Sequence, residues 1–244
     1  MRRTLLSMTQ SILSDMDSEG VNSISDTVEA MQVASVIEDT FYNIIIARDI
    51  PEHRQLVKLV SLSDNTRPTH FTYPSNTRKL EEIRYNTSTS SISQYSLVHF
   101  VEPDVFLDRM SDSANNVMSV LDVNSGTKLF IRTDVAPTYY TSFDDDRIVM
   151  NSYDASVESS LKTSKTRAFG YIIPTFSQTD DFEPDLDDVM LPYLLAEAKS
   201  TCFSLFKSGV DPKVDQAARR LKSYVQNDMY KTKKENQRPK YGRR

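Results

Sequence analysis

Three consecutive aspartates, Asp144, Asp145 and Asp146, form the longest uninterrupted run of carboxylates in the chain. Carboxylate oxygens are the ligands that Mg²⁺ and Ca²⁺ prefer. However, consecutive side chains of an extended segment alternate between two faces, and the Asp-x-Asp-x-Asp-Gly calcium loop is missing. We therefore interpret the run as a turn before a strand that begins near Arg147. A metal-dependent hydrolase that uses the acidic clusters stays as an alternative.

Other residue types that could support catalysis are few and scattered. The three histidines, His53, His70 and His99, are too far apart for a helical two-histidine metal motif. No Gly-x-Ser-x-Gly nucleophile elbow occurs. The single cysteine, Cys202, lies on an apolar helical stripe, which predicts a core residue rather than a nucleophile. We therefore predict no catalytic residue, no metal ligand and no enzyme activity.

The five glycines and the single cysteine exclude further classes. The glycines are dispersed, whereas a Rossmann fingerprint or a P-loop needs clustered glycines, so no nucleotide cofactor is expected. One cysteine can form neither an internal disulfide nor a cysteine-rich zinc site. No apolar run approaches the ~20 residues of a membrane span, so we expect no membrane partner.

The formal net charge of −5 is unevenly distributed along the 244 residues. Residues 213–244 carry 11 basic and 3 acidic residues, a net of +8, and the rest of the chain therefore carries −13. A basic tail on an acidic body predicts contact with an acidic partner or with nucleic acid. The predicted partner-binding residues are Tyr230, Lys231, Lys233, Lys234, Arg238, Lys240, Tyr241, Arg243 and Arg244.

The basic tail and the acidic cluster around Pro184 each allow more than one interpretation. The tail lysines and arginines, with tyrosines between them, could make the chain a nucleic-acid-binding module, because aromatic rings stack on bases. The acidic cluster around Pro184 could contact a neighbouring subunit, or could be a solvated linker that favours the start of the next helix. Its predicted subunit-contact residues are Asp180, Asp181, Glu183 and Asp185.

The elements that must position these residues follow from apolar periodicity. Apolar side chains recur at a helical period over residues 5–16 and 28–45, with Thr4 and Asp26 as the expected N-caps and Pro51 closing the second helix. Short β-prone segments follow, including a hairpin over 117–133 with Gly126 in its turn. Helical spacing returns at Leu191, and Asp211-Pro212 begins a final helix. Gly209 is the expected end signal of the helix before it.

This order of elements predicts an α+β fold. Helices at both ends of the chain cannot bury their apolar faces separately, so we expect one discontinuous helical bundle with an inserted antiparallel β domain and a basic C-terminal tail. The predicted boundaries are 1–52 and 181–230 for the bundle, 53–180 for the insertion and 231–244 for an extended arm.

Several short segments resemble the head-to-tail adaptor proteins of short-tailed bacteriophages, also called tail tubular protein A or head-completion proteins. The resemblance covers most of the chain through short, diffuse motifs. These are the segments 21–30 (VNSISDTVEA), Tyr153-Asp154 leading to 160–166 (SLKTSKT), 182–187 (FEPDLD), 194–198 (LLAEA) and 217–220 (AARR). Family members have a helical bundle with a β-rich insertion, which agrees with the layout predicted from periodicity.

The resemblance implies a structural role in the virion, at the interface between head and tail, after assembly in the host cytoplasm. Such adaptors form a homo-oligomeric ring, usually a dodecamer, beneath the portal protein. The ring extends the DNA channel, so genomic DNA would pass through without sequence-specific binding. Residues 229–244 would dock on the portal, and the β insertion would face the next tail component, a nozzle-like ring, or tail fibres.

Overall fold

The computed structural model describes residues 3–62, 66–88, 94–110, 116–144, 146–154, 166–207 and 211–237, and in the last helix its side chains as far as residue 227. The fold is α+β, as predicted, with strands between helices of the two chain ends. The chain divides into two compact units. One contains residues 1–52 and 174–244, and the other contains residues 53–173.

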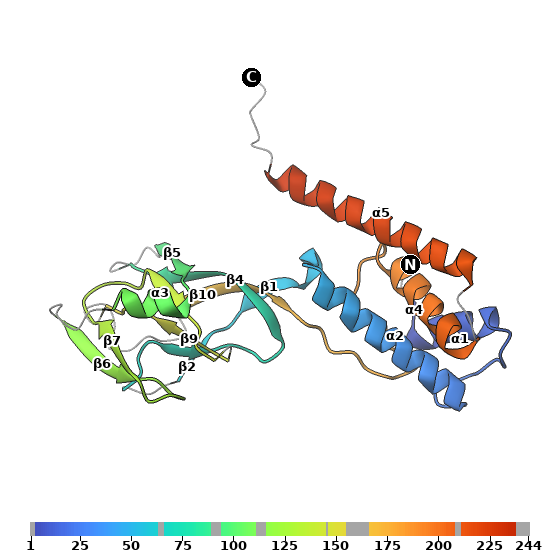
Figure 1. Ribbon diagram of the computed structural model, residues 1–244, viewed down its shortest axis with the longest axis horizontal. Helices are drawn as coiled ribbons and strands as arrows, with labels where there is room; N and C mark the ends of the chain where they lie inside the picture. Colours follow the sequence, from blue (N-terminus) through green and yellow to red (C-terminus); the bar gives the residue numbers. More distant parts are fainter. Residues whose placement is uncertain are drawn as a thin grey trace, which may run out of the picture. The chain divides into compact units, whose positions relative to one another are not determined.

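The first unit is a helical bundle made from both ends of the chain. It brings together helices from the N-terminal and C-terminal parts of the chain, which Figure 1 shows side by side. They are α1 (Leu5–Asp15), α2 (Val28–Ala47), α4 (Leu191–Phe206) and α5 (Pro212–Gln237). Helix α4 packs against both α2 and α5. Ile12, Ile37, Phe41, Leu194 and Ala198 are fully buried in this core.

The helix starts agree with the sequence prediction at one cap and differ at the other. Thr4 caps α1, because its hydroxyl accepts a hydrogen bond from the amide of Ser7. Asp26 was predicted to cap α2, but this prediction is wrong. Thr27 caps the helix, because its hydroxyl accepts a hydrogen bond from the amide of Ala30. Asp26 instead accepts from the amides of Asn22 and Ser23, because its carboxylate closes the preceding turn.

The segment 174–190 also belongs to the helical unit, although the predicted insertion extended to residue 180. The first-turn amides of a helix have no intrahelical acceptor. In α1 two of them donate to this segment, Leu5 to the carbonyl of Phe182 and Leu6 to that of Asp180. Phe176 packs its ring on Phe41, with centroids 5.2 Å apart. These contacts place the domain boundary at Ile173.

The second unit is built around a curled eight-stranded sheet with one short helix, α3 (Pro103–Asp108). Its strand order is β1-β10-β4-β5-β8-β9-β3-β2, and β6 and β7 form a separate antiparallel pair. A 3₁₀ turn at Pro51–His53 precedes it. The strands are β1 (Arg54–Val57), β2 (Val60–Ser61), β3 (His70–Thr72), β4 (Thr77–Asn86), β5 (Tyr95–Phe100), β6 (Val117–Leu121), β7 (Lys128–Arg132), β8 (Tyr139–Thr141), β9 (Arg147–Met150) and β10 (Thr166–Ile172).

Two features of this sheet differ from the sequence prediction. Strand β8 was not predicted, and it pairs in parallel with β5, whereas a wholly antiparallel sheet was expected. A parallel pair needs a long crossover connection. Here α3 and the β6–β7 pair lie between β5 and β8 in the chain, so the connection is long enough. The predicted hairpin over 117–133 is confirmed, and Gly126 has a φ of +66° in its turn.

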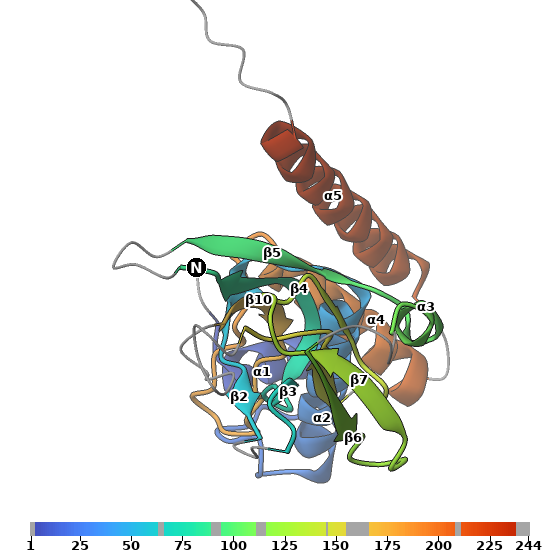
Figure 2. The same cartoon turned by 90° about the vertical axis from the view of Figure 1, so that its left-hand side faces the viewer.

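Register separates the two faces of the strands β1, β10, β4 and β5, which pair in that order. One row across them consists of Val57, Ala168, Ile83 and Val98, and all four side chains are buried. This row faces the core of the unit. Residues one position away along each strand therefore point to the opposite, outer face. Figure 2 shows β10, β4 and β5 side by side.

The last helix is longer than the sequence predicted. An extended arm was expected from residue 231, but α5 continues to Gln237. Residues 231–237 contain lysine, glutamate and glutamine, which favour helix, and the next proline is Pro239. The predicted helix-end residue Gly209 lies outside the described part of the chain, as do residues 238–244. Among the residues that the structure describes, no helix is long and apolar enough to span a membrane.

Candidate functional site

Helix α5 packs on α4 through a narrow apolar stripe. Asp211 caps it by accepting a hydrogen bond from the amide of Lys213, 2.8 Å away, and Pro212 occupies the first turn. Over residues 212–227 only Ala218 and Val225 are buried, with Val214 and Leu221 half-buried. The other side chains of that stretch, including Tyr224 at 60% exposure, are half-buried or exposed. Over residues 212–227 the helix therefore presents most of its circumference to solvent.

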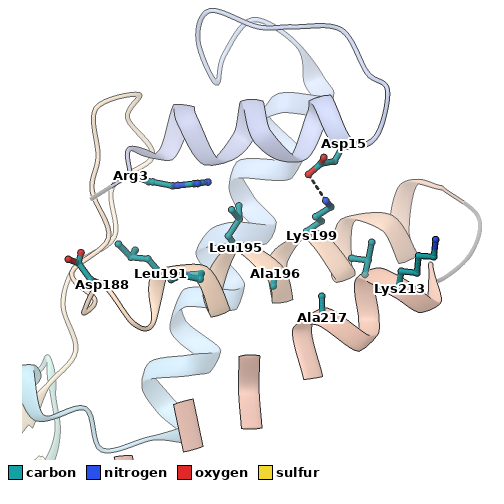
Figure 3. Close-up of a pocket in the computed structure, with 11 residues that line it drawn as sticks. Arg3, Asp15, Asp188, Leu191, Leu195, Ala196, Lys199, Lys213 and Ala217 are labelled. Atoms are coloured by element: carbon teal, nitrogen blue, oxygen red, sulfur yellow. Dashed lines mark hydrogen bonds and ion pairs between the residues drawn. The ribbon is translucent and has the colours of Figure 1, made fainter. Parts of the chain in front are cut away.

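A recess of about 520 Å³ lies where α4 meets α5 and the segment before α1. Apolar residues of α4 and α5 form its floor, and charged residues surround it (Figure 3). Lys199 forms an ion pair with Asp15 at one end. Arg3 extends toward Leu195 from the segment before α1 (Figure 3). The floor residues are Leu191, Pro192, Leu195, Ala196, Val214 and Ala217.

The chemistry of this recess suits the packing of an apolar side chain. Its floor has no nucleophile, and its charged groups, Arg3, Asp15, Asp188, Lys199 and Lys213, stand at the rim. An apolar patch rimmed by charges is typical of protein–protein contact. Leu205, at the end of α4, adds a further apolar side chain that is 62% exposed. The helical unit thus has the surface of a binding element.

The predicted tail residues divide between the helix and the undescribed end. Tyr230, Lys231, Lys233 and Lys234 lie on the helical backbone of α5. Arg238, Lys240, Tyr241, Arg243 and Arg244 lie outside the described residues. The helix therefore includes Lys231, Lys233 and Lys234, where an extended arm was expected, and Tyr230, which was predicted to lie in the bundle. The basic patch begins as part of a folded element.

The predicted acidic subunit-contact residues differ in what they contact. Asp180 accepts a hydrogen bond from the amide of Ile24, 2.8 Å away, so it fastens the segment 174–190 to the loop before α2. Asp180 therefore has an intrachain role, and its predicted contact with a neighbouring subunit stays a prediction. Asp181, Glu183 and Asp185 are exposed, whereas Pro184 and Leu186 of the same segment are buried. The exposed carboxylates therefore face away from the helical bundle.

Asp144 and Asp146 lie in a bend before β9, which agrees with the turn that the sequence indicated. One oxygen of Asp144 accepts from the amides of Asp146 and Arg147, and the other contacts the Arg147 guanidinium and the Asn124 amide. Asp145 lies outside the described residues. Among the residues that the structure describes, no group of three or more histidine, cysteine, aspartate or glutamate side chains is placed to hold a metal ion.

The single cysteine is a core residue of α4, as predicted. Cys202 is 0% exposed, and burial raises the pKa of its thiol to about 12. Since the thiolate is the reactive form, we expect native protein at about pH 8 to react with a thiol reagent far more slowly than urea-unfolded protein does. Labelling with and without urea, followed by mass spectrometry, measures this. Equal rates in the two states would contradict the buried position.

His70 on β3 is buried in the second unit, and burial lowers its pKa below the ordinary value. Asp122 and Asp144 raise this pKa, and Arg67 and Arg147 lower it. The unfolded chain therefore binds a proton at this histidine more readily than the native chain. We expect the free energy of unfolding to fall between about pH 7 and pH 5.5, as the histidine of the unfolded chain takes up its proton.

Urea unfolding at the two pH values measures that change. A His70→Leu variant should lose the part of the pH dependence that comes from this histidine. The matched control is His99→Asn, because His99 lies exposed on β5. An unchanged pH dependence in His70→Leu would show that another group is responsible.

Two surface features of the structure, the recess and the exposed side of β10, were not predicted from the sequence. The recess combines residues from four parts of the chain, so no local sequence pattern predicts it. Arg167, Phe169 and Tyr171 alternate along β10, and that spacing indicates one exposed face of a strand.

A comparison with models of protein families found no match to this chain. A comparison with curated proteins found no similar sequence either.

Proposed function

We propose that this chain is a structural protein of a bacteriophage virion, a head-to-tail adaptor that forms a ring beneath the portal. The observation that carries the proposal is α5, a 26-residue helix. A helix of this length extends about 39 Å at 1.5 Å per residue. Most helical stability in proteins comes from packing, yet over residues 212–227 only Ala218 and Val225 are buried. Such a helix is suited to bind a further protein.

The distribution of charge supports the portal as the protein that α5 binds. The net of +8 over residues 213–244 would attract an acidic docking surface, and many equivalent copies in a ring would multiply a weak contact through avidity. The remaining −13 would suit the wall of a DNA channel, because negative walls do not trap a polyanion. The β unit would then be available to the next tail component or to fibres.

The test of this function reverses charge at the end of α5. We expect Lys231→Glu/Lys233→Glu/Lys234→Glu to lose binding to the purified portal protein of the same virus. The matched control, Arg219→Glu/Arg220→Glu/Lys222→Glu, changes the same number of charges in the first half of the helix and should retain binding. Co-sedimentation with the portal and electron microscopy of the complex are the measurements.

Three outcomes would contradict the proposal. Wild-type chain that does not bind portal would remove the adaptor function. Equal losses in both charge variants would show nonspecific attraction instead of docking by the C-terminal end. Salt-dependent binding of DNA without portal binding would favour the nucleic-acid-binding alternative, because phosphate contacts release counterions.

A further inference from the structure

The outer sheet face, the solvent side of β1, β10, β4 and β5, has the composition of a protein interface. Register places Leu56 opposite Phe169, and Arg167 opposite Arg84, which is opposite Leu97. Leu56 is 66% exposed and Leu97 is 43% exposed. Arginine and aromatic residues are enriched at binding hot spots, and this face combines both with exposed leucines.

Arginines lie over three aromatic rings of this face. The guanidinium of Arg167 is 4.0 Å from the ring centre of Tyr95, and that of Arg54 is 5.0 Å from the ring centre of Phe169. The guanidinium of Arg78 is 5.7 Å from the ring centre of Tyr171. Cation–π contacts hold these long side chains in place. Because the rings are covered, they are poorly placed to stack on nucleic-acid bases, and the face favours a protein partner.

The face has a net positive charge. Two of its arginines form ion pairs with carboxylates of β4, Arg54 with Glu81 and Arg84 with Glu82. Counted over the whole face, the five basic side chains of Arg54, Arg78, Lys79, Arg84 and Arg167 and the two carboxylates of Glu81 and Glu82 give a formal total of +3. A partner that fits this face therefore presents several carboxylates.

The same chain carries a surface of that kind on its helical unit. We define the acidic strip as Asp181, Glu183, Asp185 and Asp187, which are exposed and have a formal charge of −4. Phe182, Pro184 and Leu186, between them, are buried or half-buried and hold the segment on the bundle. The carboxylates are therefore presented by a fixed part of the fold.

From this charge complementarity we propose that the outer sheet face of one copy binds the acidic strip of a second copy. The two surfaces differ, so the contact is heterologous, and contacts of this type build rings when the rotation closes. The inference rests on the proposed ring and names the subunit contact within it. It is independent of α5, which is proposed for the portal.

Paired charge reversals test the contact. The face variant is Arg78→Glu/Arg167→Glu, and the strip variant is Asp181→Lys/Asp187→Lys. The face variant changes the formal charge of the face from +3 to −1, and the strip variant changes that of the acidic strip from −4 to 0. We therefore expect each variant to self-associate more weakly than the wild type by at least about tenfold. An equal mixture regains the wild-type contact between the face of the strip variant and the acidic strip of the face variant, so we expect mixed pairs to form. Sedimentation velocity at low salt measures association, and circular dichroism checks that each variant is folded.

Two control variants distinguish this contact from a general effect of charge. Arg78→Lys/Arg167→Lys keeps the charge and should associate as the wild type does, with the same weakening at high salt. The control Lys128→Glu/Lys222→Glu reverses two exposed lysines outside the face and should also associate normally. In the wild type, a zero-length carbodiimide should couple Lys79 of one copy to the acidic strip of an isotope-labelled second copy.

Several results would overturn the inference. They are folded variants that associate as the wild type does, mixtures that do not recover, and a wild-type chain that neither associates nor gives the cross-link. Binding of a single-stranded oligo(dT) that only the face variant loses, with association unchanged, would reassign the face to nucleic acid. Loss of portal binding by the α5 variant with association intact would leave this contact standing. If the face variant still binds the portal and associates as the wild type does, only the proposed contact between subunits is overturned.

Discussion

Replacing Phe41 by alanine is expected to lower the free energy of unfolding by about 3–5 kcal/mol. Phe41 is 0% exposed on α2, and its ring contacts those of Tyr42 and Phe176. The substitution removes a buried aromatic ring and leaves a cavity that the neighbouring helices fill only in part. It also removes the surface on which the segment 174–190 packs, so the cost falls on the junction between distant parts of the chain.

Urea unfolding followed by circular dichroism at the helical signal measures this effect. The matched control is Ile46→Ala on the same helix, because Ile46 is 61% exposed and its truncation should change stability by less than about 0.5 kcal/mol. A loss below about 1 kcal/mol for Phe41→Ala would mean that the ring does not hold the bundle together.

Replacing Gly170 by valine is the second large expected effect, with a loss of about 1–3 kcal/mol or more. A Cβ atom at this position would lie 2.6 Å from the backbone carbonyl oxygen of Lys79 and 3.0 Å from a methyl group of Val57. The carbonyl belongs to the neighbouring strand, where the register shifts between Phe169 and Gly170. Backbone cannot move aside as a flexible side chain can, so β10 and β4 must separate.

The comparison variant is Gly20→Ala, because no heavy atom lies within 4 Å of a Cβ built there. We expect this control to unfold as the wild type does and Gly170→Val to unfold at a lower urea concentration. The same displacement would move Tyr171 on the outer sheet face. A variant of Gly170 that is as stable as the wild type would contradict the close approach of the two strands.

Much of the secondary structure was predictable from local signals. The apolar stripes of α1, α2 and α4 have the helical period, and Thr4, Pro212 and Gly126 are found where the caps and the turn were predicted. These features depend on a few residues that are neighbours in the sequence. The α+β class followed, because helical patterns at both ends enclose strand patterns.

Competition between neighbouring residues was harder to judge. Asp26 and Thr27 are both good N-caps, and the choice depended on whether the Asp26 carboxylate was already used by the turn at Asn22 and Ser23. The end of α5 was predicted too early, because apolar periodicity stops after residue 230 while helix propensity continues. Apolar periodicity marks only the part of the helix that packs on α4, whereas the helix propensity of residues 231–237 extends it to Gln237.

The sequence by itself determined the helical stripes, the hairpin turn, the buried place of Cys202 and the separation of charge between body and tail. Only the tertiary structure decided that Asp180 anchors a segment on Ile24 and that residues 174–180 belong to the bundle. It also assembled the recess, and it placed Arg167 of β10 over Tyr95 of β5. Local patterns reflect interactions a few residues apart, whereas these contacts join residues far apart in the chain, and their pairing exists only once the strands are in register and the helices are packed.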